Sequence, residues 1–148
     1  MKIDKIQALR GPNIWSVQRK KLIQMRLDLE EMEQFPTNKI EGFRERIEAM
    51  FPTMIEHRCS EGCRGGFFSR VERGTWMGHV IEHIALEIQT LAGMETGFGR
   101  TRETKTPGVY NVVFSYTEEN VGLFAAESAV AIAESLIAGT EYDVEADI

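Results

Sequence analysis

The stretch TWMGHVIEHIALEIQTL, residues 75–91, decides how this chain folds. We expect it to form one helix, because apolar residues recur in it at helical spacing and make one wide face. This apolar face consists of Met77, Val80, Ile81, Ile84, Ile88 and Leu91. Trp76 and Leu86 fall on the other side of the helix, so we expect both sides to be covered by the rest of the chain.

His79, Glu82 and His83 form the pattern H-x-x-E-H on this helix. At about 100° per residue, two histidines four residues apart lie about 40° apart on one face, one turn from each other. Two imidazoles placed in this way can bind one metal ion, and the glutamate can reach a water molecule beside it. The motif therefore indicates a metal site whose third ligand comes from elsewhere. A helix with two structural histidines is the alternative.

The last predicted helix, residues 118–138, offers a candidate for that third ligand. After its first turn its only ionisable residues are Glu127 and Glu134, which are seven apart and share one face within about 20°. Because burial of a carboxylate without a partner is unfavourable, the two either face solvent or face a cation such as a metal. The sequence leaves both possibilities open.

The composition indicates one soluble globular domain. The chain has 148 residues, of which 43% are hydrophobic and 27% charged. Its net charge of −6 argues against nucleic-acid binding and permits a basic substrate. We find no apolar run that approaches membrane-spanning length and no apolar leader at the N-terminus, so we expect no membrane partner and a cytoplasmic location.

Two cysteines, Cys59 and Cys63, lie close to His57 in the segment HRCSEGC. Their spacing is wider than that of most zinc sites, and a disulfide is disfavoured in a reducing compartment. We therefore expect two free thiols in a loop.

The rest of the chain predicts an α+β fold, with a small antiparallel sheet and helices packed on one face. Apolar and polar residues alternate in two of the three expected strands, which is typical of a sheet with one covered face. Residues 1–139 form the predicted domain, and residues 140–148 are interpreted as the start of a linker. The expected strands are residues 3–9, 21–29 and 109–116, and the expected helices are residues 40–50, 67–92 and 118–138.

A long polar segment, residues 94–107, is interpreted as a loop. Loops of this length in compact domains are often functional. Arg100 and Arg102 lie in it, and a hydrolase needs a cation or a hydrogen-bond donor for the developing oxyanion. Two surface arginines are the alternative.

Several blocks of the sequence together resemble the N-terminal domain of cyanophycin synthetases. They are LRGPNIWS, KLIQMRLDLE, RGGFFSRV, GTWMGHVIEHIALEIQ and GFGRTRETKTPGVYNVVF, and they span nearly the whole chain. These enzymes build a poly-aspartate chain with arginine on each side-chain carboxylate, using two ATP-dependent ligase modules that follow this domain. The resemblance implies two partners, cyanophycin and the ligase domains of the same full-length protein. We also expect a homo-oligomer.

The H-x-x-E-H motif followed by a helix with two glutamates seven apart is also similar to pitrilysin-type inverted-zincin peptidases. That resemblance implies a zinc ion bound by His79, His83 and Glu134. It makes Glu82 the general base and Glu127 a supporting carboxylate.

The assignment of the third ligand leaves alternatives open. The gap between the motif and Glu134 is shorter here than in pitrilysin-type peptidases, so Glu127 or Glu87 can take its place. Glu87 follows His83 by one turn but lies about 80° from His79 around the helix, which is a poor angle.

The two resemblances together imply zinc-dependent hydrolysis of the cyanophycin backbone, which would release short primers for the ligase modules. Arg100 would stabilise the oxyanion and Arg102 would contact the substrate. Alternatively, the domain is non-catalytic and anchors the polymer or mediates oligomerisation. Acidic residues such as Asp28, Glu30 and Glu72 would then bind the arginine-rich polymer. A peptidase for ordinary peptides is a third interpretation.

Overall fold

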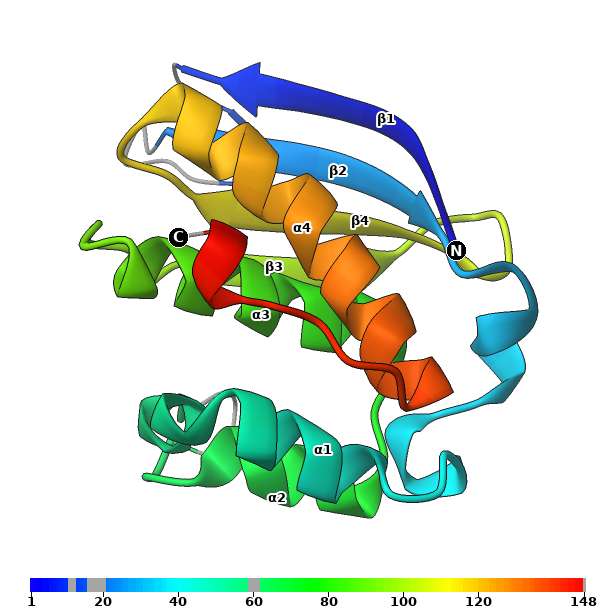
Figure 1. Ribbon diagram of the computed structural model, residues 1–148. Helices are drawn as coiled ribbons and strands as arrows, with labels where there is room; N and C mark the ends of the chain where they lie inside the picture. The colour runs from blue at the N-terminus through cyan, green and yellow to red at the C-terminus, as the bar shows by residue number, and fades with distance from the viewer. Residues whose placement is uncertain (11–12, 16–20, 59–61, 148) are drawn as a thin grey trace.

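The computed structural model describes residues 1–10, 13–15, 21–58 and 62–147. Figure 1 shows three layers: a sheet, then the helix pair α3 and α4 against one face of it, then the helix pair α1 and α2. The strands are β1 Lys2–Leu9, β2 Leu22–Asp28, β3 Gly99–Glu103 and β4 Val109–Ser115. The helices are α1 Phe43–Met50, α2 Gly66–Arg73, α3 Met77–Leu91 and α4 Glu119–Ala138. The predicted α+β class is confirmed.

The sheet is antiparallel throughout, in the order β1-β2-β4-β3. Alternation in β2 and β4 directs one set of side chains to the helices, and these pair across the two strands as Ile23 with Phe114 and Met25 with Val112. All four are fully buried. The three strands expected from the sequence are therefore present, each within about one residue of its predicted bounds.

Strand β3 is the one strand of the described residues that the sequence did not predict. It lies inside the segment that was interpreted as a loop, and Arg100 pairs with Val113 of β4. Its sequence, GRTRE, has no apolar alternation, because β3 is an edge strand that is mostly exposed.

The predicted helix 67–92 is two helices, α2 and α3, joined by residues 74–76. Gly74 ends α2 with φ of +113°, a conformation that side chains other than glycine rarely adopt. A Cβ at this position would also lie only 2.7 Å from Oδ1 of Asn38. The break turns the chain, so that α3 leaves α2 and enters the centre of the domain.

Hydrogen bonds from Thr37 stabilise the junction between α2 and α3. Its hydroxyl donates to the carbonyl of Val71 at 2.6 Å and accepts from the backbone N–H of Thr75 at 3.0 Å. Its own backbone N–H donates to the carbonyl of Thr75 at 2.8 Å. These bonds satisfy buried backbone groups that a helix end leaves unpaired, and they fix the position of Thr75.

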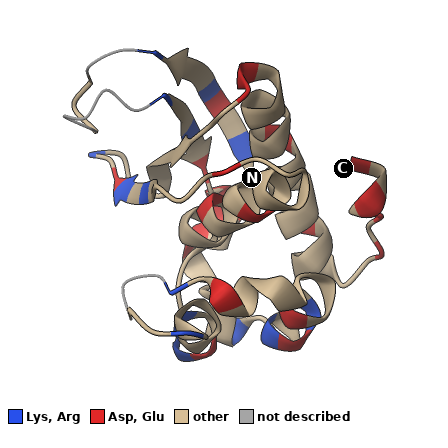
Figure 2. Ribbon diagram, turned by 90° about the vertical axis from the view of Figure 1, so that its left-hand side faces the viewer, with Lys and Arg blue, Asp and Glu red and all other residues tan. Residues whose placement is uncertain are grey.

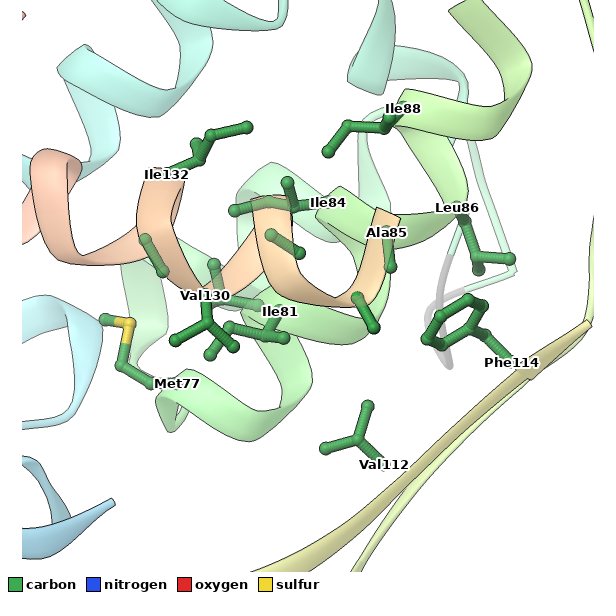
Figure 3. Packing of buried hydrophobic residues seen from close by; sticks show 14 of the residues in the cluster. Met77, Ile81, Ile84, Ala85, Leu86, Ile88, Val112, Phe114, Val130 and Ile132 are labelled. Carbon is green, nitrogen blue, oxygen red and sulfur yellow. The ribbon is translucent and has the colours of Figure 1, made fainter. Parts of the chain in front are cut away.

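Helix α3 occupies the centre of the domain. Twelve of its 15 residues are buried, including four polar or charged ones besides its apolar stripe: Glu82, His83, Glu87 and Gln89. Figure 3 shows Ile81 and Ile84 of α3 packed with Val130 and Ile132 of α4. The expectation that both sides of this helix are covered is confirmed for residues 77–89, whereas Trp76 and Leu91 at its two ends are each 41% exposed.

Helix α4 has 20 residues and is apolar enough, by length and composition alone, to cross a membrane. This corrects the expectation that no apolar run approaches spanning length. In the structure α4 packs against α3 and strands β1 and β2, and more than half of its apolar window is buried there. This burial is the behaviour of a core helix.

The segment after α4 stays on the domain. Gly139 ends α4 in the left-handed conformation, with φ of +74°. Tyr142 and Val144 then pack against the core, and a short 3-10 helix follows at Glu145–Asp147.

Candidate functional site

A cavity of about 980 Å³ lies beside α3 and contains the H-x-x-E-H motif. Its walls come from α2, α3, β3 and the segment around the 3-10 helix η3, Pro52–Glu56. The motif residues His79, Glu82 and His83 all line it, as do Trp76 and Leu86. Figure 2 shows the acidic residues of α3 in the middle layer, between the sheet and the α1 and α2 pair. The volume is that of a typical ligand-binding cavity.

All three histidines of the chain meet in this cavity. His83 and His79 lie edge to face with ring centroids 4.7 Å apart, and His57 lies 5.1 Å from His83. The fully buried ring of Phe67, from α2, stacks on His83 at 4.4 Å and meets His79 edge-on at 5.8 Å. Phe67 therefore restricts the orientation of both motif histidines.

Each motif histidine has a polar partner at its Nδ1. Nδ1 of His79 lies 3.0 Å from the hydroxyl of Thr75, and Nδ1 of His83 lies 2.9 Å from Nδ1 of His57. Histidines that bind metal in proteins usually engage one ring nitrogen in this way and coordinate through the other. Coordination through Nε2 is therefore the mode that the two rings fit.

Glu87 supports His57 from the far side. Its Oε2 lies 2.7 Å from Nε2 of His57, and its Oε1 accepts a hydrogen bond from Thr53. Burial acts to raise the pKa of Glu87, but the hydrogen bonds from His57 and Thr53 outweigh it and lower the pKa below its ordinary value. Glu87 is therefore an ionised carboxylate with both oxygens engaged.

Glu82 is buried at the cavity wall, with 6% of its surface exposed. Thr101 donates a hydrogen bond to its Oε1 at 2.8 Å, and a Cβ on Gly99 would lie 2.6 Å from its Oε2. Burial raises the pKa of Glu82 to about 7, against the opposing effects of the Thr101 hydrogen bond and the charge of Arg100. A carboxylate with this pKa is suited to take up and release a proton near neutral pH.

The two motif histidines are neutral at neutral pH. Burial and the charge of Arg70 lower the pKa of His79 to about 4. Burial, followed by the neighbouring rings of His79 and His57, lowers the pKa of His83 well below its ordinary value. Neutral imidazole is the form that binds a metal ion.

The residue types of the motif are ones that bind zinc in proteins. Two neutral imidazoles from one face of a helix are donors that zinc prefers. The carboxylate of Glu82 lies beside them as the candidate base, with its Oε2 3.8 Å from Nε2 of His83. Among the residues that the structure describes, however, no three His, Cys, Asp or Glu side chains converge as a complete metal-binding group. The donor set is therefore one protein ligand short of a catalytic zinc site.

The structure does not bring Glu127 and Glu134 to the histidines. Both are exposed on the outer side of α4, in line with the small residues Ala131 and Ala138. Of the described residues that line the cavity, none comes from α4. The pair therefore occupies a solvent-facing stripe, which was the alternative that the sequence left open.

Arg100 and Arg102 lie on β3, where successive side chains point to opposite sides. Gly99, Thr101 and Glu103 line the cavity, and the two arginines do not. Their guanidinium groups instead stack over Phe98 and Trp15, at 5.5 Å from each ring. The guanidinium groups of the cavity wall are those of Arg58 and Arg70.

The remaining acidic candidates lie away from the cavity. Asp28 ends β2 and accepts a hydrogen bond from the backbone N–H of Glu30 at 2.9 Å. Glu30 pairs with the N-terminal amine at 3.2 Å, and Glu72 is exposed on α2.

One of the two cysteines, Cys63, is an exposed free thiol, whereas Cys59 lies outside the described residues.

His57 and Thr101 are the cavity residues that the sequence did not single out as part of this site. In the sequence His57 stands beside the two cysteines, and nothing local connects it with a helix that starts 20 residues later. The available signal was indirect: the chain has only three histidines, and two of them form the motif. Thr101 lay in the segment interpreted as a loop, where its alternation with Arg100 and Arg102 was not recognised.

Comparison with known proteins places this chain in a family. The chain is 56% identical over 145 residues to a cyanophycin synthetase of Geminocystis herdmanii and 54% identical over 144 residues to one of Synechocystis sp.. A cyanophycin synthetase of Crocosphaera subtropica is 52% identical over 145 residues. These matches cover 97–98% of this chain but only 16–17% of each relative. The chain thus spans about a sixth of the length of the curated relatives it matches.

A family model described as the cyanophycin synthase-like N-terminal domain matches residues 24–138. The chain therefore belongs to the cyanophycin synthase-like N-terminal domain family. The matched region includes the motif helix, the cavity and most of the sheet.

Proposed function

We propose that this domain is a zinc-dependent peptidase that hydrolyses the backbone of cyanophycin and so provides short primers for polymerisation. The observation that supports it best is that His79, Glu82 and His83 line one cavity of about 980 Å³, with Glu82 and His83 buried and His79 partly buried. Burial of these ionisable groups costs stability, and a fold that needed only a packed helix would place apolar residues there. Similarity to whole cyanophycin synthetases supports the choice of substrate.

The charge of the cavity wall suits an arginine-bearing polymer. Four carboxylates line the cavity, those of Glu56, Glu82, Glu87 and Glu103, against two arginines. Glu103 on β3 is exposed and can meet a guanidinium group that enters from solvent. Glu56 at the end of η3 is also exposed and already pairs with the guanidinium of Arg64 at 2.9 Å. The net charge of −6 acts in the same direction over a longer range.

In the proposed reaction, His79 and His83 would hold zinc, together with a third donor still to be identified. When bound, zinc would supply Lewis acidity to the scissile amide. Glu82 accepts a proton from the attacking water and passes it to the leaving nitrogen. Thr101 and the close backbone of Gly99 hold the Glu82 carboxylate in place for both transfers. Arg58 and Arg70 replace Arg100 and Arg102 as the candidates for oxyanion stabilisation.

The test measures zinc content and cyanophycin degradation on the same samples of the wild-type chain and of His83→Ala. We expect about one zinc per wild-type chain, shortening of the polymer, and loss of both in the variant. Glu134→Gln is the matched control, since this exposed carboxylate lies away from the cavity. A wild-type chain with full zinc occupancy that leaves cyanophycin uncut under all conditions contradicts the proposal and favours a polymer-anchoring domain.

A further inference from the structure

Three residues outside the motif form a hydrogen-bonded chain that ends on His83. The hydroxyl of Thr53, in η3, bonds to Oε1 of Glu87, and Oε2 of Glu87 lies 2.7 Å from Nε2 of His57. Nδ1 of His57 then lies 2.9 Å from Nδ1 of His83. Glu87 and His83 are 2% and 6% exposed, so their ends of these bonds are shielded from solvent, whereas Thr53 is exposed.

The hydrogen positions follow from what each group can donate. The carboxylate of Glu87 only accepts, so Nε2 of His57 must carry the hydrogen of the bond between them. In its neutral form His57 has one N–H, and with that hydrogen on Nε2 its Nδ1 is an acceptor. With His57 neutral, the bond between the two Nδ1 atoms has Nδ1 of His83 as its donor.

A neutral His83 that carries its hydrogen on Nδ1 has its lone pair on Nε2. This nitrogen lies 3.8 Å from Oε2 of Glu82, on the side of the ring that faces the rest of the motif. We propose that His57 and Glu87 are positioning residues that hold His83 in the tautomer whose Nε2 lone pair is presented to the metal. The role in metal binding rests on the proposed function, but the tautomer itself does not.

His79 provides an internal contrast. Its Nδ1 partner is the hydroxyl of Thr75 at 3.0 Å, and a hydroxyl can either donate or accept. Thr75 therefore orients the ring of His79 without dictating which nitrogen carries the hydrogen.

The first test needs neither metal nor substrate. Long-range ¹H–¹⁵N correlation spectra of the metal-free 148-residue chain report which ring nitrogen of each histidine is protonated. We expect the Nδ1–H tautomer for His83 and the Nε2–H tautomer for His57. The Nε2–H tautomer for His83 in the wild-type chain overturns the inference, whatever the domain hydrolyses.

The second test measures zinc affinity by calorimetry with zinc ion alone as the probe. In Glu87→Gln the amide can donate to His57, which allows the hydrogens of the chain to reverse, and we expect zinc to bind about 10–100-fold more weakly. His57→Phe removes the acceptor for Nδ1 of His83, and we expect its zinc affinity to fall at least as far as that of Glu87→Gln. His57→Gln keeps an acceptor oxygen and is expected to recover part of the affinity.

The outcomes separate this inference from the proposed function. If the wild-type chain binds no zinc, the peptidase proposal fails, while the tautomer measurement still decides the inference. If zinc binds equally well to wild type, Glu87→Gln and His57→Phe, the positioning role is wrong and the peptidase proposal stands. Glu134→Gln is the control for a lost carboxylate, and thermal melts establish that each variant is folded.

Discussion

Helices α3 and α4 pack against each other, and both carry acidic residues within an apolar sequence, but they place them differently. On α3, Glu82 and Glu87 point into the cavity and are 6% and 2% exposed. On α4, Glu127 and Glu134 point to solvent from a stripe of small residues. The carboxylates of α3 meet hydrogen-bond donors on other elements, Thr101 for Glu82 and both Thr53 and His57 for Glu87.

The difference teaches how to interpret a glutamate in an apolar helix. A buried carboxylate needs partners from neighbouring elements, and such partners exist only where another segment approaches that face. The α3 carboxylates have them because the η3 segment and β3 approach that helix. The outer face of α4 is exposed along the Glu127–Glu134 stripe, so its glutamates are hydrated. Periodicity groups residues by face, and the tertiary structure decides what that face meets.

The largest contrast is expected in catalysis. Glu82→Gln removes the proposed general base and should lower the rate of cyanophycin hydrolysis by about 10²–10⁴-fold, because positioned acid–base groups contribute about that much. Glu127→Gln and Glu134→Gln should leave the rate unchanged. Polymer length measured over time at matched zinc content checks this. Equal rates for Glu82→Gln and wild type would remove Glu82 from the mechanism.

The second contrast is between the two sides of α4. Ile132 is fully buried against α3, so Ile132→Ala should lower the free energy of unfolding by about 2–5 kcal/mol. The neighbouring Ala131 is exposed, and Ala131→Gln should change the free energy of unfolding by less than about 0.5 kcal/mol. Urea unfolding at pH 7.5 measures both. Similar values for the two variants would mean that α4 is oriented differently from the structure described.

The third prediction uses acid to test the burial of the motif. In the metal-free chain, the pKa of His79 is about 4 when folded and 6.5 when unfolded. Between these values only the unfolded chain takes up this proton as pH falls, so the free energy of unfolding should fall by about 1.4 kcal/mol per pH unit. His83 adds to the loss, because its pKa is also lowered by burial.

Protonation of Glu82 changes the free energy of unfolding in the opposite direction over part of the same pH range. Its pKa is raised to about 7 when folded, from 4.5, so the folded chain takes up that proton first and gains stability as pH falls. The histidine effect is therefore measured in Glu82→Gln with a chelator present. A free energy of unfolding that stays constant from pH 7 to pH 4 would contradict the burial of the histidines.

The smallest effect is expected for the exposed glutamates of α4. Glu134→Gln should change the free energy of unfolding by less than about 0.5 kcal/mol, since solvent-exposed charges contribute little. The same measurement on Glu127→Gln is its control. A loss of more than about 1 kcal/mol in either variant would indicate a partner for that carboxylate within the folded chain.

The sequence was sufficient for the parts of the fold with strong periodicity. Alternation in residues 21–29 predicted β2, and helical spacing in residues 75–91 predicted most of α3. Strand β3 could not be predicted, because an exposed edge strand with the sequence GRTRE has no apolar pattern.

For the candidate site, the sequence predicted the shared face of His79, Glu82 and His83, because that relation is local to one helix. It could not predict that His57 joins them, since the contact spans 26 residues and depends on how η3 meets α3. It also left the face of Glu134 undecided, and only the packing of α4 showed that this face is exposed. Local spacing thus defines the motif, and long-range contacts define its surroundings.

The Thr37 hydroxyl bonds have a consequence for the order of folding. Helix α3 makes its backbone hydrogen bonds within 15 residues and can begin to form on its own. The bond between Thr75 and Thr37 closes a loop of 38 residues, which carries an entropic cost that local helix formation does not. We therefore expect Thr75, and with it the ring of His79, to be fixed only after residues far upstream have docked, so that assembly of the site is a late step of folding.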